Sequence, residues 1–95
     1  MIDLKTVTYQ WDENKNRQLV QTRNISFQDV MAAIKNNQLI AITKGISSNH
    51  KEQMSFIIKL KDYVYVVPFV ADKQNQIFLK TAYPSRKYTK FYLNL

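Results

Sequence analysis

The chain has 95 residues, of which 45% are hydrophobic and 13% aromatic, so it can build one compact domain, 1–95, but not two independent cores. It contains no cysteine, which excludes disulfide bonds, thiolate metal sites and cysteine nucleophiles. Its first residues lack the apolar stretch of a signal peptide, and its longest apolar run, at 63–71, is too short to cross a membrane, so we expect a cytoplasmic protein.

The formal net charge of +7 is unevenly distributed along the chain. Up to Asp72 there are nine basic and seven acidic residues, whereas after it there are five basic residues and no acidic one. The five are Lys73, Lys80, Arg86, Lys87 and Lys90. A field of one sign over the last quarter of a small domain favours an anionic partner such as RNA, a phosphate group or an acidic protein segment. A basic surface without a specific ligand is the alternative.

Two helices are predicted in the first half of the chain. Residues 7–11 alternate as a strand does, and Asp12 can then cap a polar helix over about 13–22. The second helix has stronger signals, because Ser26 and Asp29 form a capping box and apolar residues follow at i, i+3, i+4 and i+7. These apolar residues are Phe27, Val30, Met31 and Ile34.

The second half of the chain is predicted to form strands and then a short helix. The strands are expected at 39–42, 54–60, 63–71 and 77–83. Pro68 cannot donate a ladder hydrogen bond, so a bulge or a strand end is expected near it. A last helix follows Pro84 and Ser85, with a predicted core-facing stripe of Tyr88, Phe91, Tyr92 and Leu95. Short turns between strands predict an antiparallel sheet of four to five strands, covered by the two N-terminal helices in a two-layer α+β fold.

Three short motifs follow one another in the sequence: Tyr9–Lys15 (YQWDENK), Ile25–Asp29 (ISFQD) and Ile77–Lys87 (IFLKTAYPSRK). They resemble the F-x-W-D-E-x-K opening, the (V/I)-S-F-E-(E/D) motif and the last strand before (S/P)-x-R-K of the BrnT-type toxins, whose fold is RelE-like. The resemblance implies a toxin of a bacterial type II toxin–antitoxin pair. It further implies metal-independent endoribonuclease activity on messenger RNA without a cofactor, and an antitoxin partner with a ribbon-helix-helix DNA-binding segment.

One position departs from the pattern of this family. Many members have His-Gly directly before the second motif, where this chain has Arg23 and Asn24. The guanidinium of Arg23 can hold an RNA phosphate but cannot act as a base in place of a histidine. Two alternatives to a nuclease therefore stay open: a non-catalytic nucleic-acid-binding module, and a module that binds the antitoxin or another acidic protein.

Candidate catalytic cations lie close together near the C-terminus. No His, Asp or Glu residues in the sequence are spaced as metal ligands, which favours cleavage without a metal. Such cleavage needs a base for the 2′-hydroxyl, an acid for the 5′-oxygen and cations for the charge at phosphorus. Arg86 and Lys87 fall in the first turn of the predicted last helix, where they oppose the helix dipole, and Lys90 repels both. Because none of these placements favours folding, we predict that they bind phosphate, a solvated helix face being the alternative.

Three further residues are candidates for proton transfer. Lys80 is expected on the outer face of its strand with Phe78, although an exposed lysine also discourages strand pairing at a sheet edge. Tyr83, at the end of that strand, can donate a proton or stack on a base, or it can simply pack in the core. His50 is the only histidine and lies in the polar loop 44–52; an imidazole suits acid–base catalysis near neutral pH, and a surface histidine is the alternative.

Overall fold

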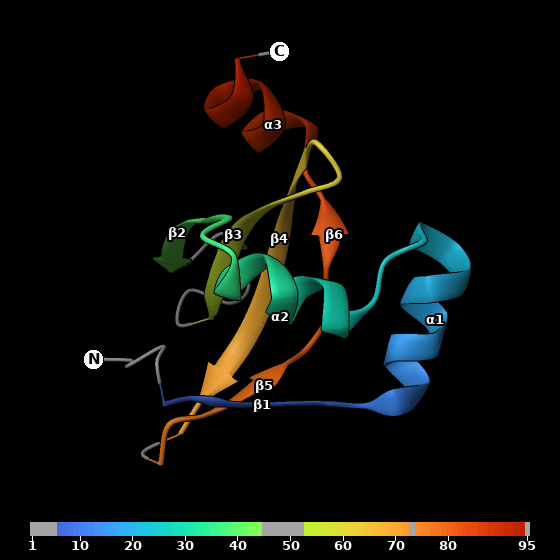
Figure 1. Ribbon diagram of the computed structural model, residues 1–95, viewed down its shortest axis with the longest axis vertical. Coiled ribbons are helices and arrows are strands. Elements are labelled where there is room, and N and C mark those ends of the chain that lie inside the picture. The colour runs from blue at the N-terminus through green and yellow to red at the C-terminus, as the bar shows by residue number, and fades with distance from the viewer. Residues whose placement is uncertain (1–5, 45–52, 73, 95) are drawn as a thin grey trace.

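The computed structural model describes residues 6–44, 53–72 and 74–94 (Figure 1). The fold is α+β, as the sequence predicted. Its elements are β1 (Thr8–Trp11), α1 (Glu13–Arg23), α2 (Phe27–Lys35), β2 (Leu39–Lys44), β3 (Met54–Leu60), β4 (Tyr63–Ala71), β5 (Gln76–Leu79), β6 (Tyr83–Pro84) and α3 (Arg86–Leu93). No helix in these described ranges is both long and apolar enough to span a membrane.

The two N-terminal helices begin where the sequence predicts. The carboxylate of Asp12 accepts the N–H of Asn14 at 2.8 Å and caps α1. Ser26 and Asp29 each accept the other's backbone N–H, at 3.0 and 2.9 Å, so the predicted capping box at the start of α2 is confirmed. Asn24 ends α1 with a left-handed φ of 57°, which turns the chain sharply from one helix into the other.

The strands form one six-stranded sheet in the order β1-β5-β4-β3-β2, with β6 also paired to β4. The three consecutive pairs, β2 with β3, β3 with β4 and β4 with β5, are antiparallel, as the short turns predicted. The sheet is thus mostly antiparallel, and β1 is the exception: it lies parallel to β5 at the edge of the sheet, which the sequence did not predict. Because α1 and α2 carry the chain from this edge to β2 at the opposite edge, no hairpin determines the direction of β1.

The last predicted strand is interrupted opposite Pro68. β5 ends at Leu79 and β6 begins at Tyr83. On β4, Phe69 pairs with Leu79 of β5 and Val66 pairs with Tyr83 of β6. The two β4 residues are three positions apart, whereas their partners are four positions apart, so the segment from β5 to β6 contains one extra residue. The N–H of Lys80 donates to the carbonyl of Pro68 at 2.9 Å, but Pro68 has no N–H with which to return the bond. The expected bulge near Pro68 therefore lies not in β4 itself but in the segment that joins β5 to β6.

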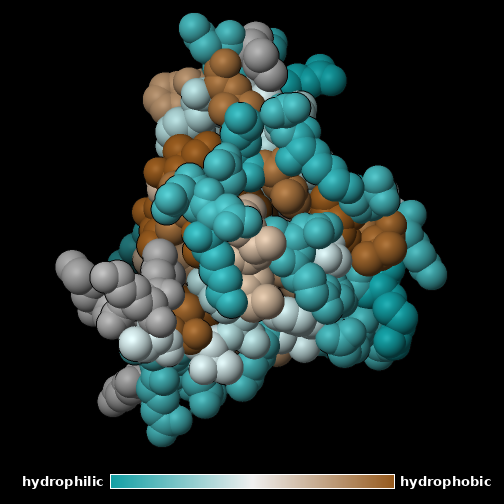
Figure 2. Space-filling model, in the orientation of Figure 1, coloured by the Kyte–Doolittle hydropathy of each residue, from teal (hydrophilic) through white to brown (hydrophobic). Residues whose placement is uncertain are grey.

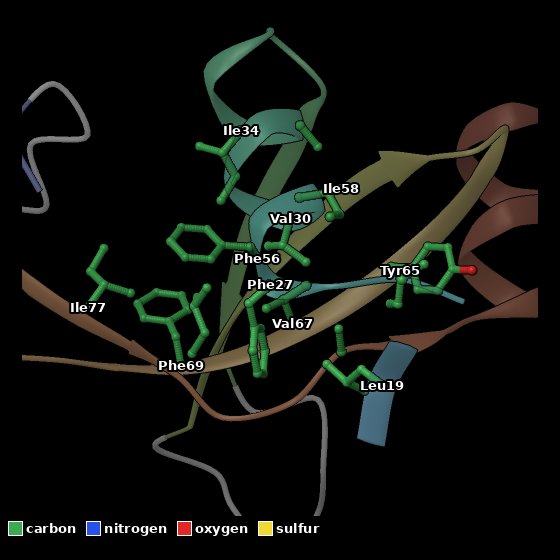
Figure 3. Packing of buried hydrophobic residues seen from close by; sticks show 14 residues of the cluster. Leu19, Phe27, Val30, Ile34, Phe56, Ile58, Tyr65, Val67, Phe69 and Ile77 are labelled. Carbon is green, nitrogen blue, oxygen red and sulfur yellow. The ribbon is translucent and has the colours of Figure 1, made fainter. Parts of the chain in front are cut away.

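The main core lies between the sheet and the first two helices, with α2 crossing in front of β3 and β4 (Figure 1). Phe27, Val30 and Ile34 of α2 point toward the sheet (Figure 3). There they meet Phe56 and Phe69, whose stacked ring centroids are 4.0 Å apart. The side chains named here are buried, so this layer provides most of the apolar burial that stabilises the fold.

The third helix packs on the opposite face of the sheet, at one end. There Ile57, Val64 and Val66 form a second buried cluster with the partly buried Tyr88 and Tyr92 of α3. The two central strands, β3 and β4, are therefore buried on both faces over this length. α3 thus adds a short covering to the two layers that the sequence predicted, and it places the basic end of the chain beside β4.

Candidate functional site

A buried hydroxyl attaches the basic helix to the sheet. Thr89 is 3% exposed, and its Oγ1 accepts the N–H of Val64 at 2.9 Å and donates to the carbonyl of Ser85 at 2.7 Å. The N–H of Ser85 donates in turn to the carbonyl of Val64 at 2.9 Å, and its hydroxyl caps α3 by accepting the N–H of Tyr88 at 3.1 Å. These bonds hold the first turn of α3 against the start of β4. No residue pattern in the sequence singles out Thr89 for this role.

Three predicted cations lie exposed on α3. Arg86 and Lys87 occupy its first turn, as predicted, and Lys90 follows one turn later. None of the three forms a salt bridge or a side-chain hydrogen bond with any residue in the described ranges. The first turn has no acidic residue. The positive charge of Arg86 and Lys87 therefore faces solvent beside the N-terminal amides of the helix, where an anion is favoured, while Lys90 lies in the last turn.

Tyr83 lies beside this cationic turn. It is half-buried on β6 and packs against the same cluster as Tyr88. Burial raises the pKa of the Tyr83 phenol above its usual value of 10.0, and the neighbouring Tyr88 raises that pKa further. Lys87 lies next to the same pair, with its Nζ 5.9 Å from the centroid of the Tyr88 ring. Tyr83 can therefore donate a proton near neutral pH but cannot accept one there as a base.

Arg23 reaches the interrupted sheet edge from the end of α1. Its Nη1 donates to the carbonyl of Ala82, which directly precedes Tyr83 in the chain. A guanidinium has five N–H donors, so the exposed Arg23 can still hold a phosphate oxygen. The structure thus brings a residue of the first helix to the same edge as the C-terminal candidates, which the sequence could not indicate.

Two other candidates do not join this group in the described structure. Lys80 is exposed in the segment between β5 and β6, and Phe78 is 40% exposed, in agreement with the outward orientation predicted for both. Lys80 nevertheless belongs to the stretch opposite Pro68 rather than to the turn that carries Arg86. His50 lies outside the described residues.

One predicted packing residue of α3 is in fact exposed. Phe91 is 74% exposed, although its helical spacing from Tyr88 predicted a place in the core. The buried side of α3 is instead formed around Thr89, because its hydrogen bond to Val64 sets the rotation of the helix. This prediction is therefore wrong for Phe91, while Leu95 lies outside the described residues.

The first turn of α3 thus offers exposed cations that suit an anion, and Tyr83 is a protonated phenol near neutral pH. No protein-family model and no curated protein sequence matches the chain, so its function has to be inferred from these side chains and from the three short motifs.

Proposed function

We propose that this protein is a metal-independent endoribonuclease that cuts messenger RNA in the cytoplasm, as the toxin of a type II toxin–antitoxin pair. The observation that supports it most is the first turn of α3, where Arg86 and Lys87 are exposed and have no ion-pair partner among the described residues. Cations at a helix N-terminus oppose the helix dipole, at a cost of about a few tenths of a kcal/mol each. A phosphate bound there removes this conflict, since it is attracted by both the cations and the helix end.

Each side chain has a distinct role in the proposed reaction. The planar fork of Arg86 holds two phosphate oxygens, and Lys87 adds a point charge to the same group. A base removes the 2′-hydroxyl proton, the 2′-oxygen attacks phosphorus, and the 5′-oxygen leaves with a proton donated by Tyr83. The products are a 2′,3′-cyclic phosphate and a free 5′-hydroxyl. The base is a group other than Tyr83, because the raised pKa of Tyr83 suits only the acid. His50, which lies outside the described residues, is the candidate, since Lys80 lies opposite Pro68 and away from the cationic turn.

RNA on either side of the cut is held by more distant cations in this proposal. Arg23 and Lys90 bind the flanking phosphates, and both are exposed. The basic C-terminal quarter of the chain also matches an acidic segment of the antitoxin, whose expected ribbon-helix-helix portion binds DNA. Such an antitoxin inhibits by covering the same cations.

A second candidate function is RNA binding without cleavage. It is favoured by Arg23, which stands where many BrnT-type toxins have a histidine and which uses its guanidinium to bond the Ala82 carbonyl. An arginine in this place can bind phosphate but cannot remove a proton. The two candidates predict equal binding to RNA and differ in whether the RNA is cut.

The deciding experiment is an RNA cleavage assay with the purified full chain in excess chelator. We expect messenger RNA to be cut and the fragments to end in cyclic phosphate, because only side chains take part in the proposed chemistry. Expression of the chain alone in a bacterium should arrest growth as messenger RNA is lost. RNA that is bound but stays intact would support the second candidate, and cleavage that depends on added magnesium would contradict the proposed mechanism.

A further inference from the structure

Phe91 is the most exposed of the large hydrophobic side chains in the described ranges, at 74%. Its ring and the ring of Tyr92 form a T-shaped pair, with centroids 4.8 Å apart and the planes at 81°. Most of the surface of the Phe91 side chain is nevertheless open to solvent. Most of the stabilisation that burial of a phenylalanine contributes to a fold is therefore absent at this position. One exposed apolar residue is ordinary in itself, so its surroundings decide what it can do.

The surroundings of Phe91 combine aromatic and cationic side chains. A recess of about 500 Å³ on the outer side of α3 is lined by Lys87, Tyr88, Lys90 and Phe91. Figure 2 shows brown apolar surface among teal polar side chains over α3, at the top of the view. The chain has no acidic residue after Asp72, so none of its own carboxylates in this segment competes for the two lysines. An apolar ring beside two ammonium groups matches a ligand with a flat apolar face and negative charge.

We infer that this outer face of α3 binds single-stranded nucleic acid, with one unpaired base stacked on Phe91 and the adjoining phosphates at Lys87 and Lys90. Every base offers a π face to an aromatic ring, and stacking of this kind is available only where the base is not paired. The inference rests on the proposed function for RNA as the ligand, and it adds that a single strand is bound in preference to a duplex.

The position of the ring along the helix fits a nucleotide next to the cleaved one. Phe91 follows Lys87 by four residues, which is about 6 Å of helix rise. A strand whose phosphate lies at Arg86 and Lys87 can thus place a neighbouring base on Phe91. A second copy of the chain that docks through the same helix is a poor occupant, because it would bring two basic helices together without an acidic side chain from either of them.

The test measures binding to a short unstructured RNA with 2′-O-methyl groups, which cannot be cut, and to the duplex of the same sequence. Full-length wild type is compared with Phe91→Ala, Phe91→Leu and Phe91→Trp by fluorescence anisotropy. We expect the alanine and leucine variants to bind the single strand about tenfold more weakly and the tryptophan variant to bind at least as tightly as wild type. Duplex binding should be equal in all four proteins. Val20→Ala, which trims a 49% exposed side chain on α1, is the matched control and should bind as wild type does.

The tryptophan variant provides a second readout. The emission of the indole introduced by Phe91→Trp should be quenched by the single strand and not by the duplex, whereas Trp11 stays stacked on Phe27 at 5.7 Å and reports no change. A leucine variant that binds as wild type does, or Phe91 variants that lose only antitoxin binding, would overturn the inference. Absence of cleavage of unmodified RNA refutes the proposed nuclease alone if single-strand binding still depends on Phe91. If unmodified RNA is cut but the Phe91 variants bind the single strand as tightly as wild type does, the stacking site alone is refuted.

Discussion

The N–H of Val64 donates to the hydroxyl of Thr89 at 2.9 Å, a bond that joins β4 to a helix 25 residues further along the chain. The same hydroxyl donates to the carbonyl of Ser85 at 2.7 Å, so one side chain serves both the strand and the first turn of α3. Since Thr89 is almost fully buried, water cannot replace either bond. The orientation of the basic helix, and with it the placement of Arg86 and Phe91, depends on this contact.

Replacement of Thr89 by valine should therefore destabilise the fold. The change keeps the shape of the side chain but leaves the buried N–H of Val64 without an acceptor, which costs about 1–3 kcal/mol. Urea denaturation measures the loss of unfolding free energy. Thr89→Ser is the control, because it keeps the hydroxyl and should lose less than the valine variant. Equal stability of Thr89→Val and wild type would show that α3 is held by its apolar contacts alone.

Removal of the charges of Arg86 and Lys87 should affect function and not folding. In the double alanine variant the Tm should stay the same or rise slightly, because both cations oppose the helix dipole. RNA cleavage should fall at least tenfold, about 1.4 kcal/mol, as measured by initial rates. Arg17→Ala with Lys35→Ala removes the same net charge from exposed positions on α1 and α2 and should leave cleavage intact.

Tyr88→Ala separates packing from chemistry on the same helix. Tyr88 packs against the second buried cluster, so its loss should lower the Tm by an amount equivalent to about 1–3 kcal/mol. If the double variant at Arg86 and Lys87 melts lower than Tyr88→Ala yet cuts RNA at the wild-type rate, the proposed role of the cationic turn is wrong.

Tyr83→Phe should slow cleavage while RNA binding is unchanged. The substitution keeps the half-buried ring and removes the hydroxyl that donates the proton, which is worth about 10²–10⁴ in rate for a general acid. Single-turnover cleavage gives the rate, and anisotropy with uncleavable RNA gives the binding. A phenylalanine variant that cuts at the wild-type rate would assign the acid to another residue.

Stability at alkaline pH should reflect the raised tyrosine pKa values. Burial raises the pKa of Tyr9 and of Tyr83 above 10.0 in the folded protein, so both phenols bind their protons more tightly there than in the unfolded chain. Their contribution to stability is fully present below pH 10.0 and is lost as the pH rises through the folded-state values. Urea denaturation at a series of pH values should show this decline. It should be shallower in Tyr83→Phe, and an unchanged slope there would contradict the shift assigned to Tyr83.

The sequence determined those features that depend on neighbours in the chain. Asp12 caps α1, Ser26 and Asp29 form their box, and the hairpin of β3 and β4 joins the two most apolar segments. Each of these involves residues a few positions apart, for which the geometry of a turn or a helix end is nearly independent of the rest of the fold. The cationic first turn of α3 was predictable for the same reason, because the cap at Ser85 is local.

Only the tertiary structure decided the features that depend on distant partners. The direction of β1 follows from the path of two helices, and the break between β5 and β6 lies opposite a proline on another strand. Arg23 meets the carbonyl of Ala82 across 59 residues. The spacing of aromatic residues in α3 is compatible with more than one buried side, since successive residues are only about 100° apart around a helix. The hydrogen bond from Val64 to Thr89 selects among them, and it is this choice that leaves Phe91 exposed.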